Sequence, residues 1–225
     1  MKKYNGKKFL VLALSLGGVY IMVNLVKKKQ DEAKVKEIIK GIELPPTSED
    51  IDYSTVFSKI PNYLKAKVPK VAYQRGMELY DELNKRNIPT KHKVWIFLQA
   101  MHESAIFQKP AGKYNYWGIK VPSVPVYFEN WKKNYLDPKD PVSIKFTFEI
   151  LKGKKVEIIS KFANFASITH AVNLYLRLTA VKEALSKART LKEFVAILKD
   201  KGYFTDYFDN YYLALKRHND NVMTA

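Results

Sequence analysis

The sequence predicts a mainly α fold of the α+β class, with one small β-hairpin and a membrane-spanning helix in front of the domain. Apolar residues recur at helical spacing over much of residues 51–225. Apolar and polar residues alternate strictly over residues 142–150, and residues 9–26 carry no charge. A chain of 225 residues can form one well-packed domain with an appendage, but hardly two full domains.

Residues 9–26 form the first predicted element, and lysines flank them on both sides. A helix of this length spans about 27 Å, close to the roughly 30 Å of a hydrocarbon core. A cleaved signal peptide is the alternative, but residues 22–26 lack the small residues that signal peptidase prefers. We therefore expect a retained, single-pass anchor in a lipid membrane, preceded by a basic segment at residues 1–8.

Residues 27–50 separate this anchor from the rest of the chain. Their first part is highly charged, which predicts an exposed stalk, and Pro45-Pro46 is typical of a linker. The domain is therefore expected to comprise residues 51–225.

The first part of the domain is expected to be helical. One helix is predicted from apolar residues at helical spacing between Ala72 and Leu83. Asn87-Ile88-Pro89 should end it, and Thr90 is the expected N-cap of the next helix, which carries Glu103. The aromatic and proline-bearing stretch 121–141 is interpreted as a long loop.

The alternating stretch predicts a half-buried strand with Val142, Ile144, Phe146, Phe148 and Ile150 on its buried face. A turn at residues 152–154 and a return strand at 156–162 complete the hairpin. After it, Ser167 should cap a helix running to about Ala180. Residues 190–193 form a capping-box pattern, and Gly202 suits a helix C-terminal stop.

The formal charge of +17 favours an anionic partner. Nucleic acid is not expected, because the lysines are spread along the chain and no recognised binding motif accompanies them. Bacterial walls and membrane surfaces are also anionic. The absence of cysteine excludes disulfides, thiol catalysis and a lipoprotein anchor. No metal-ligand spacing and no phosphate-binding loop is present, so we expect neither a metal nor a cofactor.

Glu103 is the strongest catalytic candidate. It ends an apolar helical run, and its neighbours three and four positions away include Gln99 and Phe107. A carboxyl on such a face resists ionisation and can act as a general acid near neutral pH. The alternative is a buried structural glutamate that is paired with a lysine or capped by a hydroxyl.

Two segments in order, Gln99-Ala-Met-His-Glu-Ser104 and Asn115-Tyr-Trp-Gly-Ile-Lys120, resemble the glucosaminidase family of bacterial cell-wall hydrolases, glycoside hydrolase family 73. Residues 146–167 are similar to the family's hairpin and its phenylalanine-rich exit, and Gly202-Tyr-Phe-Thr-Asp206 is similar to its Gly-Tyr-Ala-Thr-Asp segment. The resemblance implies a lysozyme-like helical domain. Ala105-Ile-Phe107 departs from the family's Gly-Trp-Gly, and Phe204 replaces an alanine.

The resemblance also implies the roles of individual residues. Glu103 is the general acid, Glu149 is a second acid acting as base or charge stabiliser, and Tyr203 orients the substrate. A solvated charge beside Lys145 is the alternative for Glu149, whose rivals as second acid are Glu157, Glu129 and Asp137. The predicted substrate-binding residues are Ser104, Asn115, Tyr116, Trp117 and Asp206. For four of these an alternative stays open: a backbone-bonded Ser104, a turn-shaping Asn115, and core positions for Tyr116 and Trp117.

These features predict a membrane-anchored enzyme that hydrolyses β-1,4 bonds in the glycan strands of peptidoglycan, as an endo-β-N-acetylglucosaminidase or a muramidase. The domain should face the wall, in a bacterial envelope or a membrane-containing virion, where it would be a phage lytic enzyme. A lytic transglycosylase on the same fold is one alternative. An inactive, membrane-anchored wall-binding or structural protein is another.

Overall fold

The computed structural model describes residues 51–151 and 154–225. The predicted basic segment, anchor and stalk, residues 1–50, lie outside the described residues, and so do residues 152–153 of the hairpin turn. Within the two described ranges, no helix combines the length and the apolar character that crossing a membrane requires.

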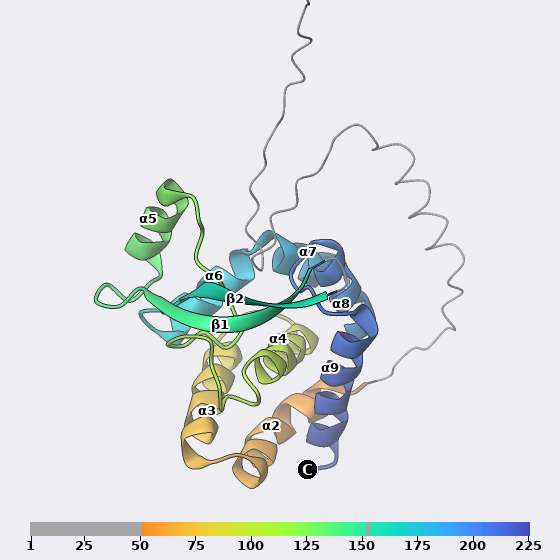
Figure 1. Ribbon diagram of the computed structural model, residues 1–225. Coiled ribbons are helices and arrows are strands. Elements are labelled where there is room, and N and C mark those ends of the chain that lie inside the picture. Colours follow the sequence, from red (N-terminus) through yellow and green to blue (C-terminus); the bar gives the residue numbers. More distant parts are fainter. Residues whose placement is uncertain (1–50, 152–153) are drawn as a thin grey trace, which may run out of the picture. The chain divides into compact units, whose positions relative to one another are not determined.

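The described chain is mainly helical and contains one two-stranded antiparallel sheet, which confirms the predicted fold class at this level (Figure 1). The elements are α2 (Tyr53–Lys67), α3 (Lys70–Asn84), α4 (Thr90–Glu103), α5 (Pro125–Asn134), β1 (Val142–Leu151), β2 (Lys154–Ala163), α6 (Ile168–Arg177), α7 (Thr179–Lys187), α8 (Leu191–Asp200) and α9 (Phe208–Met223).

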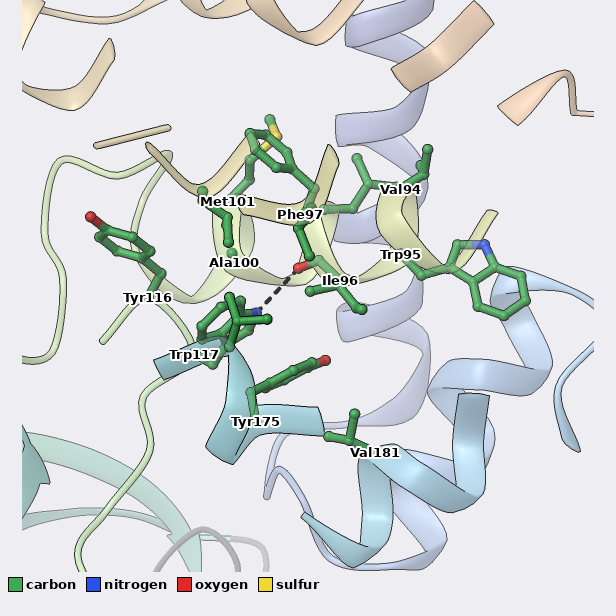
Figure 2. Close-up of a cluster of buried hydrophobic side chains, with 14 of the residues drawn as sticks. Val94, Trp95, Ile96, Phe97, Ala100, Met101, Tyr116, Trp117, Tyr175 and Val181 are labelled. Carbon is green, nitrogen blue, oxygen red and sulfur yellow. Dashed lines mark hydrogen bonds between the residues drawn. The ribbon is translucent and has the colours of Figure 1, made fainter. Parts of the chain in front are cut away.

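Helix α4 is the centre of the core. Every residue from Val94 to Met101 is buried, and α2, α3 and α9 all pack against this helix. Trp117, from the segment after α4, donates its indole N–H to the carbonyl of Ile96 at 3.2 Å and stacks on Tyr175 with ring centroids 4.4 Å apart (Figure 2). A helix buried on all sides is held firmly, so its C-terminal residue Glu103 has a fixed position.

Two expectations about this half of the domain are wrong. Thr90 is already helical, and the residue before it is Pro89, which provides no side-chain cap. The predicted loop at 121–141 contains α5, which begins with Pro125 at its first turn and buries none of its residues. Phe128 and Trp131 of α5 are partly buried against the core, and with Val124 and Tyr135 they recur at helical spacing, a signal that the loop interpretation overlooked.

The C-terminal half follows the predicted helix signals more closely. Thr190 and Glu193 form the expected capping box, Ser167 caps α6, and Gly202 follows α8 with a positive φ of 69°. The single helix expected after Ser167 is divided in two, because Leu178 has an extended ψ of 129°. The chain therefore turns between α6 and α7.

The hairpin is in the predicted place, with Val142 paired to Ala163 and Phe146 to Ile159. Its orientation is opposite to expectation, because the alternating apolar residues Ile144, Phe146 and Phe148 face solvent. Glu149, on the other face, is buried at 7% exposure. Alternation defines two faces of a strand but not which face packs inward, and here the polar face has partners in the domain.

Candidate active site

Glu103 ends α4 and keeps part of its surface in contact with solvent. Its Oε1 accepts a hydrogen bond of 2.6 Å from the hydroxyl of Tyr211 on α9. Removal from water raises the pKa of Glu103 to about 7, and the charges of Glu149 and Asp206 add to this rise, whereas the Tyr211 hydrogen bond opposes it. The carboxyl is therefore about half protonated at neutral pH, as a general acid requires.

Two buried polar side chains, Tyr175 and Gln99, orient the Tyr211 hydroxyl. Tyr175 donates to the amide oxygen of Gln99, so the amide nitrogen of Gln99 is directed to the Tyr211 oxygen, 3.0 Å away. Tyr211 accepts that hydrogen bond and must direct its own proton to Glu103 Oε1. When Glu103 is protonated, its acidic proton is therefore on Oε2.

Space is kept open beside Oε2 of Glu103. A Cβ atom added to Gly118 would lie 3.7 Å from this oxygen, and Gly118 has a positive φ of 65°, which favours glycine. Among the described residues, none donates a hydrogen bond to Oε2. The proton on this oxygen is therefore available for transfer to a bound molecule.

Phe204 supports Tyr211 from the other side. The two rings are parallel within 5° and their centroids are 3.8 Å apart. Stacking of this kind restricts the ring orientation of Tyr211. The departure from the family's alanine at this position therefore has a structural role, because it packs the tyrosine that contacts the acid.

The turn after Glu103 contains three consecutive residues with positive φ, Ala105, Ile106 and Phe107, at 49°, 54° and 62°. This conformation costs roughly 1–2 kcal/mol for each L-residue, so the turn needs stabilising contacts. The buried Ser104 hydroxyl stabilises the turn, since it donates to the Ala100 carbonyl at 2.6 Å and accepts from the Phe107 amide at 2.9 Å. The Ser104 side chain is therefore engaged by the backbone of the turn, and its predicted contact with substrate stays a prediction.

Glu149 is a buried residue on β1, not a solvated charge beside Lys145. Lys120 forms an ion pair with its Oε1, and the Thr205 hydroxyl donates to its Oε2 at 2.8 Å. These contacts hold the carboxylate against the segment that contains Gly118. Lys120, the partner of Glu149, follows two residues after Gly118, which lies beside Glu103 Oε2, and the charge of Glu149 contributes to the raised pKa of Glu103.

The rival acids are positioned less well. Glu129 and Glu157 are exposed, and Asp137 binds Lys113 at 2.6 Å. None of the three contributes to the raised pKa of Glu103. Glu149 is therefore the better second acid.

Tyr203 does not contact Glu103 by a hydrogen bond. Its hydroxyl donates to the carbonyl of Trp117 at 3.3 Å, and burial raises its pKa well above the usual range. The tyrosine therefore holds the residue before Gly118 in place. The orientation of substrate by Tyr203 stays a prediction, and the tyrosine that contacts the acid is Tyr211.

The Asn115-Tyr116-Trp117 segment is buried and shapes the site from behind. The Asn115 side chain binds the backbone of Ile119 and the carbonyl of Ala163 on β2, at 2.8–2.9 Å. Tyr116 and Trp117 are each 2% exposed and belong to the core. These contacts and burial agree with the turn-shaping and core alternatives, and contact of the three residues with substrate stays a prediction. Asp206 is half-buried, and its charge acts on Glu103.

Three solved structures are similar to this chain. A peptidoglycan hydrolase mutant from Sphingomonas sp. A1 has 17% identity and a TM-score of 0.48, covering 73% of this chain and 99% of its own. A C-terminally truncated glycoside hydrolase domain of Salmonella typhimurium FlgJ has 20% identity and a TM-score of 0.40 over 77% and 99%. The catalytic domain of the Listeria monocytogenes autolysin Auto has 18% identity and a TM-score of 0.40 over 86% and 96%.

The first two proteins are a peptidoglycan hydrolase and a glycoside hydrolase domain, the class to which the sequence motifs point. No protein-family model matches the chain, and comparison with curated proteins gives no match. In the part of the chain that the structure describes, no cluster of three or more histidine, aspartate or glutamate side chains is arranged to hold a metal ion.

The sequence did not reveal the hydrogen-bond and ion-pair network around the two acids. Its members are Gln99, Lys120, Thr205 and Tyr211. One signal was available. Gln99 is the single polar residue in the buried run Val94–Met101 of the central helix, and a buried amide requires hydrogen-bond partners. The Tyr211 contact had no such signal, because it joins residues 108 positions apart.

Replacement of Tyr211 by phenylalanine should shift the alkaline limit of activity to higher pH. The hydrogen bond from Tyr211 lowers the pKa of Glu103, so its loss lets that pKa rise above about 7. A general acid works in its protonated form, so the rate should stay level below this pKa and fall about tenfold per pH unit above it. The pH profile of kcat/KM measures the shift.

Tyr207→Phe is the matched control for this experiment, because Tyr207 is exposed. Its profile should equal that of the unchanged protein. An unchanged alkaline limit in Tyr211→Phe would mean that this limit does not report the ionisation of Glu103.

Proposed function

We propose that this protein hydrolyses β-1,4 glycosidic bonds in the glycan strands of peptidoglycan, with Glu103 as general acid. One observation carries the proposal. A carboxyl with a pKa of about 7 presents its proton on an open oxygen, next to a second, salt-bridged carboxylate. Most glycosidases carry out this reaction with two carboxyl groups, whose different environments give them different pKa values. The family resemblance of the motifs supports peptidoglycan as the substrate.

The reaction begins with transfer of the proton from Glu103 Oε2 to the glycosidic oxygen. The bond between this oxygen and the anomeric carbon then breaks, and the leaving sugar departs as an alcohol. Positive charge develops on the ring that remains. The Glu149 carboxylate stabilises this charge or removes a proton from the water that attacks the anomeric carbon. Glu103, now ionised, recovers a proton from solvent.

A lytic transglycosylase is the second candidate, and two contacts of Glu149 favour it. Both Glu149 oxygens already have partners, Lys120 and Thr205, which restrict the movement of this carboxylate towards a water molecule. In a transglycosylase, Glu103 alone would act as acid and then as base. The 6-hydroxyl of the muramic acid would attack the anomeric carbon and close an anhydro ring.

Mass spectrometry of muropeptides released from purified peptidoglycan by the full-length protein tests the proposal. Ordinary reducing ends are expected. Products lighter by one water would indicate a transglycosylase, and the identity of the terminal sugar tells which of the two alternating bonds is cut. A wall-binding protein without turnover would release nothing. The Glu103→Gln protein, incubated in parallel, controls for contaminating activity.

The proposal includes a membrane anchor at residues 9–26. These residues lie outside those that the structure describes. Its uncharged stretch and flanking lysines support a single-pass anchor. A wall substrate then requires that the domain face the wall, in a bacterial envelope or a virion membrane.

A further inference from the structure

A shallow basic hollow of about 620 Å³ lies between the hairpin and the segment that follows α4. Among the described residues that line it, three are cationic, namely Arg75, Lys109 and Lys145, and none is acidic. A cavity lined by charges of one sign attracts groups of the opposite sign. The hollow is therefore suited to an anionic group.

Two of the three cations are held in place by the segment after α4. Arg75 donates from one of its nitrogens to the Phe107 carbonyl at 3.1 Å, and Lys145 donates to the Pro110 carbonyl at 2.7 Å. Each group keeps further N–H donors, because a guanidinium has five and an ammonium has three. Both charges are thus positioned in advance, so an anion that binds here does not have to order these long side chains.

The hollow adjoins the candidate active site along the inward face of the hairpin. Lys145 and Thr147, which line the hollow, lie on the same face of β1 as Glu149, because side chains alternate along a strand. Phe162, another lining residue, has its ring centre 5.9 Å from the ammonium of Lys120. The same ammonium forms the ion pair with Glu149. Lys120 therefore connects the wall of the hollow to the second acid.

We propose that the hollow binds a carboxylate of the peptide stem that the glycan strand carries near the bond to be cleaved. This inference rests on the proposed function. The N-acetylated sugars of the strand carry no charge, whereas the peptide stems carry carboxylates, so a cationic hollow beside the acids selects a stem rather than a sugar. Guanidinium and ammonium groups form charge-assisted hydrogen bonds with carboxylates. The hollow thus favours parts of the strand whose stems have free carboxyl groups.

The phosphate groups of another wall polymer are a second source of anionic oxygens that fit a basic hollow. The stem is favoured because it is joined covalently to the strand. Binding of the strand at Glu103 then holds the stem carboxylate near the hollow at a high effective concentration. A separate phosphate polymer has only its charge to bring it there.

Binding is measured with the full-length protein that carries Glu103→Gln, so that the ligand is not consumed. The probe is a fluorescent, phosphate-free glycan strand with peptide stems, used with free carboxyl groups or after their conversion to amides. Fluorescence anisotropy should show about tenfold tighter binding of the free-carboxyl form at low salt, because each exposed ion pair contributes modestly. The difference should shrink as salt is added. Equal binding of the two forms would overturn the proposal.

Lys109→Gln combined with Lys145→Gln tests whether the preference belongs to the hollow. The double change should remove most of the preference by weakening only the free-carboxyl form, and arginine at both positions should restore it. Lys65→Gln with Lys67→Gln, at two exposed lysines of α2, removes the same net charge and should keep the preference. Equal loss of the preference in both double variants would show that net charge alone attracts the ligand. Equal weakening of both ligand forms would assign the two lysines of the hollow a structural role. Either result would overturn the site.

Release of muropeptides by the unchanged protein separates this inference from the proposed function. If the protein releases muropeptides but binds both forms of the probe equally, the inference alone fails. If it prefers the free-carboxyl form but releases nothing, the proposed function alone fails. Binding of neither form would overturn the inference as well. Displacement of the probe by poly(glycerol phosphate) at a lower concentration of charge than by free stem peptide would make phosphate the occupant and overturn the carboxylate.

Discussion

Glu103→Gln is expected to reduce the rate of peptidoglycan cleavage at least a hundredfold while the fold stays intact. The amide is nearly the same size and can still accept the hydrogen bond from Tyr211, but it has no acidic proton on the atom that replaces Oε2. General acid catalysis contributes typically 10²- to 10⁴-fold. Release of soluble muropeptides over time measures the loss. Retention of more than about a tenth of the activity would remove Glu103 from the acid role.

The matched control is Glu157→Gln, which removes an exposed carboxyl from the hairpin and should keep full activity. Thermal unfolding shows whether the fold of the Glu103 variant is intact. The folded pKa of Glu103 is raised from 4.5 to about 7, so its ionisation destabilises the unchanged protein increasingly between these two pH values and by a constant amount above pH 7, and this cost is absent in the variant. The variant should therefore be at least as stable as the unchanged protein at pH 9.

Glu149→Gln should reduce the rate by about a hundredfold or more while substrate binding survives. A charge that stabilises the transition state contributes to kcat rather than to ground-state binding. The products decide the mechanism. A severe loss with ordinary reducing ends favours hydrolysis, whereas a mild effect with anhydro ends favours the transglycosylase.

The change also leaves Lys120 without its counter-charge in a mostly buried position, which could reduce activity indirectly. Lys120→Gln is therefore the necessary companion, since it keeps the carboxylate and removes the ion pair. If Glu149 acts on the substrate, Lys120→Gln should retain far more activity than Glu149→Gln. Equal losses in the two variants would assign Glu149 a structural role only.

The sequence predicted best what depends on neighbouring residues. The environment of Glu103 follows from its own helix, and the capping box at Thr190 is a four-residue pattern, so both were predictable. The hairpin was placed correctly for the same reason. Its inward face was not, because the partners of Glu149 come from Lys120 and Thr205, far away in the chain.

In the candidate site, too, local sequence predicted some features, whereas others depend on contacts between residues far apart in the chain. The motif with Asn115 and Trp117 indicated a functional region, but these side chains support it from the core. Which tyrosine contacts Glu103 depends on how α9 packs against α4. Local sequence pattern does not encode this tertiary contact. Tyr203 and Tyr211 therefore could not be distinguished by type or by spacing.

The hydrogen bond between Glu103 and Tyr211 also has a consequence for the newly made protein. The ribosome adds the acid more than a hundred residues before the tyrosine that orients it. A growing chain thus contains Glu103 without Tyr211, and its carboxyl lacks the buried environment until the last helix folds against α4. The hydrogen bond that directs the acidic proton to Oε2 of Glu103 therefore forms only after α9 has been synthesised.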